Sequence, residues 1–153
     1  MLLVLLVSAC GYRFVVPYAP AGVTSVSVPV FQNATTEPQV DALCTQALRE
    51  HYQRAGVLGG EGSQATVEGV VVNVSSGAFL AAPERGAFPT YRLSASVRLT
   101  LKQPGRPDRE LLASGNEEYP SGADLLITES NRATALRRLC ESLMREGAER
   151  LGE

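Results

Sequence analysis

The side chains that could carry out chemistry are scarce in this chain. It holds three cysteines, one histidine and no tryptophan in 153 residues. The histidine, His51, falls on an expected helix at the rim of an apolar stripe, without a cluster of partner residues. A single histidine in that setting is typical of a structural role rather than of general acid–base catalysis.

The acidic residues and short motifs give no catalytic arrangement either. Glu117 and Glu118 are adjacent in an expected strand, so their side chains point to opposite sides and cannot form a carboxylate pair. The sequence has no CxxC, HExxH or GxSxG motif and no glycine-rich phosphate loop. These observations favour a binding or assembly protein over an enzyme, and no metal or other cofactor is implied.

Cys10 is the cysteine with the clearest chemical context. It follows an apolar run from Leu2 to Val7 and the small pair Ser8-Ala9. The run is too short to cross a bilayer, which takes about 20 residues, but it matches the apolar part of an export signal. The small pair before a cysteine resembles the bacterial lipobox, in which the cysteine is acylated and becomes the first residue. We therefore expect a signal segment at 1–9 and a lipidated tether at 10–22.

This interpretation also predicts a location. Two or more acyl chains hold a protein firmly at a membrane, where one chain would not. Gly11 follows the cysteine, and the absence of Asp there generally favours sorting to the outer membrane. We expect a protein anchored in the outer membrane on its periplasmic side. The first charged residue is Arg13, whereas export signals usually begin with positive charge, so the sequence leaves the true start codon open.

Cys44 and Cys140 remain once Cys10 is assigned. Each lies on the apolar stripe of its own expected helix. A disulfide between them is compatible with an oxidising compartment and requires Cα atoms within about 7 Å. The alternative is two buried thiols that act as small apolar side chains. The sequence leaves both open.

The strands and helices that must position these residues are expected to form one domain, at 23–153. The chain is 44% apolar and carries a formal net charge of −2, which excludes a disordered chain and argues against a nucleic-acid partner. Alternating or valine-rich segments predict strands, and one-sided apolar stripes predict helices. The expected strands are Val23–Phe31, Gln64–Leu80, Tyr91–Lys102 and Arg109–Tyr119, and the expected helices are Pro38–Ala55 and Leu125–Leu151.

The order strand, helix, three strands, helix predicts an α+β fold. Both helices are apolar on one stripe, so the economical packing is a two-layer sandwich with both helices on one face of a four-stranded, mainly antiparallel sheet. We expect Thr35 or Thr36 to cap the first helix. Pro29 removes a hydrogen-bond donor from the first strand, which indicates a sheet edge.

The third expected strand has a polar side with three cations: Arg92, Arg98 and Lys102. Strict alternation of this kind usually marks a sheet face in contact with water. The same pattern also fits a flat polar surface that contacts a partner or an anionic headgroup.

Several short motifs together resemble the LptE family of lipopolysaccharide-assembly lipoproteins. They are Cys10-Gly11-Tyr12-Arg13 at the mature start, Val28-Pro29-Val30-Phe31-Gln32-Asn33 leading into Thr35-Thr36-Glu37-Pro38, and Tyr91-Arg92-Leu93 at the start of an alternating strand. A closing helix rich in Ala, Leu and Arg also fits. The resemblance covers nearly the whole chain and implies the same fold of two helices on a four-stranded sheet.

The resemblance also implies a function. Members of the family sit as a plug in the outer-membrane barrel LptD, help to assemble it, and assist lipopolysaccharide delivery to the cell surface without catalysing a reaction. They bind lipopolysaccharide through basic residues in the loop between the second and third strands and near the start of the last helix. Arg85 lies in the first of these two regions. The second region contains Thr128 and Asn131 but no lysine. The alternative is a free periplasmic lipoprotein that binds a small apolar ligand or the cell wall.

Replacing Cys10 by serine tests the lipidation. The variant is expected to accumulate as a soluble periplasmic or uncleaved form, because the acylated sulfur is lost. Fractionation and intact-mass measurement check this. A variant found in membranes with the acylated mass of the wild type would contradict the assignment.

Overall fold

Three long antiparallel strands form the body of the sheet in the computed structural model, which describes residues 20, 22–80 and 88–153. They are β3 (Ala65–Leu80), β4 (Thr90–Lys102) and β5 (Arg109–Pro120). The sheet order is β1-β3-β4-β5, with β2 also paired to β3. The β3 strand is therefore central, as its valine-rich sequence predicts.

The expected first strand is divided into two short pieces, which corrects the prediction of one strand over 23–31. The pieces are β1 (Val26–Ser27) and β2 (Gln32–Asn33), and both run parallel to β3. Pro29 lies between them and cannot donate to a ladder, so pairing stops there. The sheet thus counts five strands instead of four, and the predicted α+β architecture is confirmed.

The break at Pro29 also changes which side chains face the core. Val28 is buried, but Val30 is 62% exposed and Phe31 is buried in its place. Phe31 lies against β3 at Gly69, where an added Cβ would come within 2.5 Å of the phenyl ring. A glycine is needed at this position because the ring fills the space that any side chain would occupy.

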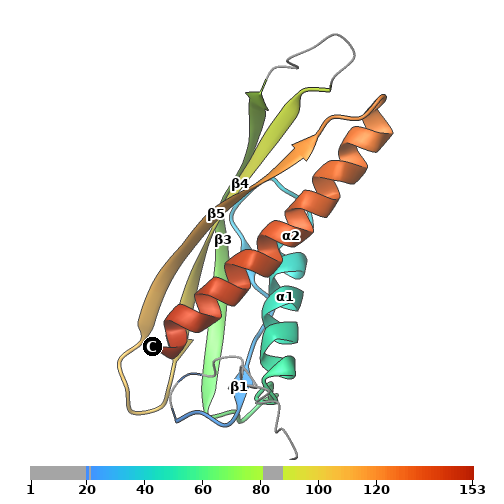
Figure 1. Cartoon of the computed structure of the whole chain (residues 1–153). Helices are drawn as coiled ribbons and strands as arrows, with labels where there is room; N and C mark the ends of the chain where they lie inside the picture. The colour runs from blue at the N-terminus through green and yellow to red at the C-terminus, as the bar shows by residue number, and fades with distance from the viewer. Residues whose placement is uncertain (1–19, 21, 81–87) are drawn as a thin grey trace, which may run out of the picture.

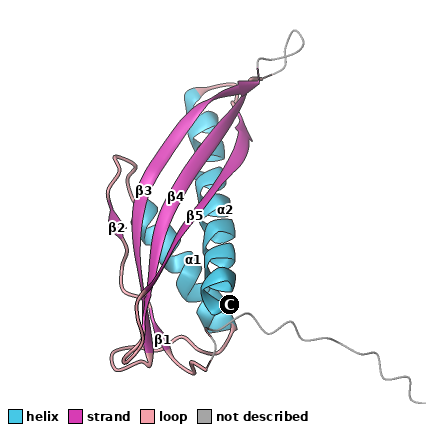
Figure 2. Ribbon diagram, turned by 90° about the vertical axis from the view of Figure 1, so that its left-hand side faces the viewer, coloured by secondary structure: helices cyan, strands magenta, loops and turns pink. Residues whose placement is uncertain are grey.

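Both helices cover the same face of the sheet. Figure 2 shows the strands in front and the helices behind them, with the opposite face bare. They are α1 (Val40–Arg54) and α2 (Leu125–Gly152). The predicted apolar stripe of α2 is buried along its length, and on β4 the side chains of Leu93, Val97 and Leu101 face the helices as the alternation predicts.

The start of α1 differs from the prediction of a threonine cap. The helix begins after Gln39, which has a φ of 62° and makes no side-chain capping bond. Thr35 instead serves a turn: its backbone N–H donates to Asn33, and its hydroxyl accepts from the N–H of Glu37. Because Glu37 also receives a forked ion pair from Arg132 of α2, the turn is tied to the second helix.

A disulfide joins the two helices at the centre of the core. Cys44 of α1 and Cys140 of α2 lie with their Cα atoms 4.8 Å apart, and both side chains are fully or almost fully buried. This position supports the bridged alternative over two separate thiols. The bridge links segments 96 residues apart in the chain, so it restrains most of the domain in its unfolded state.

Removing the bridge is expected to destabilise the domain. Cys44→Ala, Cys140→Ala and the double variant should each lower the free energy of unfolding by about 2–4 kcal/mol, because a long loop is no longer closed in the unfolded chain. Urea unfolding with and without a reductant measures this. Reductant should weaken the wild type and leave the double variant unchanged, and a wild type that is insensitive to reductant would refute the bridge.

Candidate functional site

The bare face of the sheet is the first candidate surface among the described residues. Both helices lie on the other side, so the outward side chains of β3, β4 and β5 meet solvent. The structure places Arg92, Arg98 and Lys102 together on this face, as the alternation of β4 requires. We call it the outer sheet face.

Each of these cations is paired with a carboxylate from a neighbouring strand. The pairs are Arg92–Glu118 at 2.8 Å, Arg98–Glu110 at 3.2 Å and Lys102–Glu68 at 2.8 Å. The hydrogen bond that Lys102 donates to Glu68 is the main reason that the pKa of Lys102 is raised. These three ion pairs cannot be predicted from the sequence alone, since only the strand register brings each carboxylate opposite or diagonal to its cation. The outer sheet face is therefore close to neutral.

Small uncharged side chains fill the middle of the outer sheet face. They come from all three long strands: Asn73, Ser75, Ser94, Ser96, Ser114 and Asn116. The hydroxyls of Ser96 and Ser114 lie 2.9 Å apart and share a hydrogen bond across β4 and β5. A partner could approach this band closely, because none of its side chains is long or charged.

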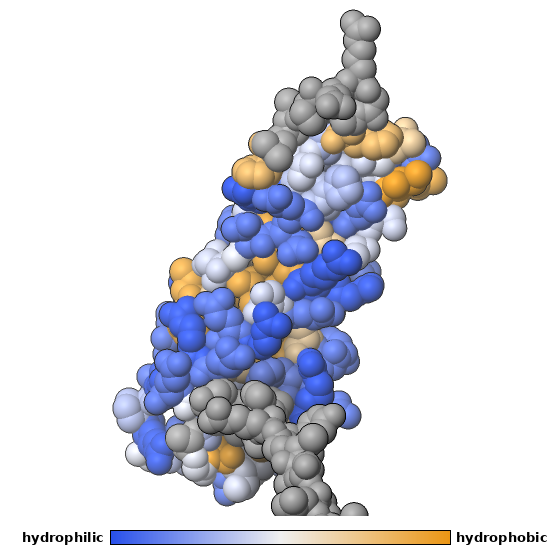
Figure 3. Space-filling model, viewed as in Figure 1, coloured by the Kyte–Doolittle hydropathy of each residue, from blue (hydrophilic) through white to orange (hydrophobic). Residues whose placement is uncertain are grey.

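One end of the molecule carries exposed apolar side chains. They lie where β3 ends, where β4 begins and on the first turn of α2: Phe79, Phe88, Leu125, Leu126 and Ile127. Leu126 is the most exposed, at 82%. Figure 3 shows hydrophobic surface gathered at this end, over the start of α2. We call these five residues the apolar tip.

Two contacts with polar residues hold the apolar tip in position. Asp124 caps α2 by accepting from the N–H of Ile127, which holds the apolar first turn in place. The guanidinium of Arg92 lies 3.3 Å from the ring centroid of Phe79, so a cation–π contact joins the tip to the outer sheet face.

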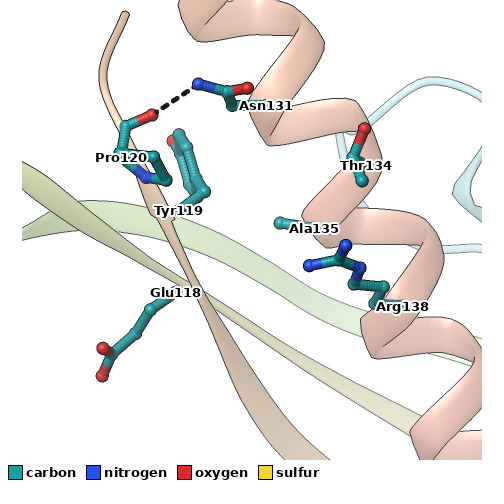
Figure 4. Close-up of a pocket in the computed structure, with 7 residues that line it drawn as sticks. All are labelled: Glu118, Tyr119, Pro120, Asn131, Thr134, Ala135 and Arg138. Atoms are coloured by element: carbon teal, nitrogen blue, oxygen red, sulfur yellow. Dashed lines mark hydrogen bonds between the residues drawn. The ribbon is translucent and has the colours of Figure 1, made fainter.

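A cavity of about 150 Å³ lies beside the tip, between the end of β5 and α2 (Figure 4). Asn131 donates to the backbone carbonyl of Pro120 at its upper rim, and Thr128 accepts from the N–H of Gly122. Both polar residues of the expected second contact region therefore have structural partners. The cation that lines the cavity is Arg138, 4.0 Å from Glu117.

The remaining candidate groups do not converge on a catalytic arrangement. His51 is buried in α1 with its ring edge-on to that of Tyr52. Glu118 faces outward to Arg92, whereas Glu117 faces Arg138 of α2, so the adjacent carboxylates point to opposite sides as predicted. Within the described residues, no group of three or more His, Cys, Asp or Glu side chains could hold a metal ion.

Two predicted sites, Cys10 and Arg85, lie outside the described residues. Their roles stay predictions. Among the helices of the described part, none is long and apolar enough to span a membrane.

Comparison with known families decides the relationship of this chain. The family model LptE, described as lipopolysaccharide-assembly, matches residues 23–151. The chain belongs to the LptE family. The match reaches from before β1 to the last turn of α2, and the resemblance inferred from the short motifs is confirmed.

Solved structures share the fold of this LptE-family chain at low sequence identity. The hypothetical protein CT253 of Chlamydia trachomatis is 10% identical with a TM-score of 0.56, covering 85% of this chain and 96% of that one. A minor lipoprotein of Acinetobacter baumannii is 8% identical with a TM-score of 0.51, covering 85% and 92%. At these identities the likeness concerns the fold alone. No curated protein matches the chain.

Proposed function

We propose that this LptE-family protein is an outer-membrane lipoprotein that plugs the LptD barrel and helps to assemble it. The outer sheet face carries this proposal: it is mostly polar, and each of its cations is paired with a carboxylate from a neighbouring strand. The interior wall of a large outer-membrane barrel is polar as well. A neutral polar face can lie against such a wall without leaving a charge unpaired.

The position of the anchor fits this arrangement. Acylation of Cys10 would hold the chain at the periplasmic side of the outer membrane. The first described residues lie beside β1, at the end of the molecule opposite the apolar tip (Figure 1). A tether of about 12 residues reaches at most roughly 40 Å. The β1 end would therefore stay within the reach of the tether from the membrane surface.

Co-purification with the barrel tests the plug. The wild type is expected to bring LptD with it from detergent-solubilised outer membrane, whereas a free periplasmic lipoprotein would not. Arg92→Glu should weaken co-purification at least fivefold, because it places two carboxylates opposite each other on the contact face.

A compensated variant separates contact from folding. Arg92→Glu combined with Glu118→Arg keeps the cross-strand pair but exchanges its charges, so the melting temperature should recover most of its loss, apart from the share of the lost cation–π contact with Phe79. Co-purification should stay reduced if the face meets the barrel in a fixed orientation. Full recovery of co-purification by the compensated variant would show that Arg92 has only a structural role.

We further propose that lipopolysaccharide binds at the apolar-tip end through Arg85. Segment 81–87 connects β3 and β4 there, between Phe79 and Phe88, which are 40% and 53% exposed. An arginine can fork onto a lipid phosphate, and exposed aromatic and aliphatic side chains suit acyl chains. Glu84 adjoins Arg85 and would reduce its field, so the apolar contacts would contribute a large share of the binding.

Charge reversal tests the phosphate contact. Arg85→Asp should bind purified lipopolysaccharide several-fold more weakly than the wild type and with a shallower dependence on salt, because one ion pair is lost. Arg106→Asp is the matched control: Arg106 is exposed in the β4–β5 turn, at the other end of these strands. Equal binding curves for the two variants, measured at low and high salt, would exclude the Arg85 contact.

A further inference from the structure

The two edges of the sheet are protected very differently. On one side the edge consists of β1 and β2, two strands of two residues each, with Pro29 between them. On the other side the edge is β5, which has 12 residues and pairs with β4 over its whole length without a register shift. Natural proteins usually shorten, bulge or cover such an edge, because its free backbone groups are a template for another strand.

The hydrogen bonds at the end of β5 reveal which of its backbone groups face outward. The N–H of Ser121 donates to the carbonyl of Pro89, and these two residues continue the β4–β5 register. In an antiparallel pair, bonded and non-bonded positions alternate. The odd-numbered residues of β5 therefore bond to β4. The even-numbered residues direct their N–H and carbonyl groups to the free edge.

The end of this edge agrees with that assignment. Pro120 is even-numbered, has no N–H, and its carbonyl accepts from Asn131 of α2 instead of from β4. Below it the outward groups belong to Glu110, Leu112, Ser114, Asn116 and Glu118, all of them exposed. Within the described part of the chain, no hydrogen bond occupies the outward N–H and carbonyl groups of these five residues.

The side chains at the centre of the β5 edge are uncharged, and three of them in a row are small. From Leu111 to Asn116 the strand has no ionised side chain, and Ser114-Gly115-Asn116 are small. Two residues along a strand span about 6.8 Å, so the outward groups recur at the spacing of another β-strand. A sugar or an acyl chain would not match this row of alternating donors and acceptors, whereas an extended polypeptide would.

We propose that β5 binds an extended segment of the barrel partner, which adds a strand to the sheet. This inference rests on the proposed function for the identity of the partner. Main-chain hydrogen bonds would supply the affinity, and the uncharged centre of β5 would select a segment without charges in the middle. The other edge cannot take this role, because its strands are too short and Pro29 interrupts them.

Proline substitution tests the outward donors. Ser114→Pro removes the N–H that faces the free edge without removing a bond to β4, and proline is tolerated at such edge positions. Ser114→Ala is the matched control, since it loses the hydroxyl contact with Ser96 but keeps the N–H. Ser114→Ala measures what the loss of the hydroxyl costs by itself, and we expect Ser114→Pro to retain at least tenfold less barrel than Ser114→Ala. Equal recovery of the barrel by a folded Ser114→Pro variant would overturn the inference.

Amide hydrogen exchange of the wild type keeps the proposal testable if the proline variant does not fold. The amides of Leu112, Ser114 and Asn116 should exchange rapidly in the free protein and slowly in the complex. Slow exchange in the free protein, or rapid exchange in the complex, would overturn the inference. A dimer of the free protein that Ser114→Pro abolishes would do so as well, because the edge would then serve a second copy. If the wild type itself recovers no barrel, the proposed function fails instead.

Discussion

Apolar and polar residues alternate along β4, so one face of the sheet is apolar and must be buried. The way in which the two helices bury that face determines the arrangement of the rest of the molecule. The apolar face is buried by two helices at close range: an added Cβ on Gly147 of α2 would lie 2.5 Å from the side chain of Leu99. Close packing of this kind leaves no room for water and contributes most of the stability of a domain. Because both helices lie on one side, the opposite face of the sheet stays bare.

The bare face then has to be compatible with water and with any partner. Its three ion pairs are exposed, and exposed pairs contribute only about 0–1 kcal/mol each to folding. Their consequence is electrostatic: they cancel the charge of the face. A protein that enters a polar barrel benefits from this, because an unpaired charge taken out of water costs several kcal/mol. The uncharged centre of the outer sheet face extends onto β5, and the open edge of the sheet is the same strand.

Three features of the molecule lie at different positions along its long axis. The chain enters beside β1 at one end, and the apolar tip lies at the other end, at the start of α2. The disulfide between Cys44 and Cys140 lies between them and ties the helices together where they meet. A helix of 28 residues is about 42 Å long, so the proposed anchoring end and the proposed lipopolysaccharide-binding end are far enough apart to act at different depths of the membrane.

The amino-acid sequence by itself determined the elements whose periodicity is strong. The alternation of β4, the apolar stripe of α2 and the meander of three strands follow from residue types within each segment, and they suffice for the α+β class. Tertiary structure decided whatever depends on two distant segments: the carboxylates opposite Arg92 and Arg98, the approach of Cys44 to Cys140, and the free edge of β5. It also decided the break at Pro29 and the start of α1 after Gln39, because Phe31 and Glu37 find partners on β3 and α2 that no local pattern reveals.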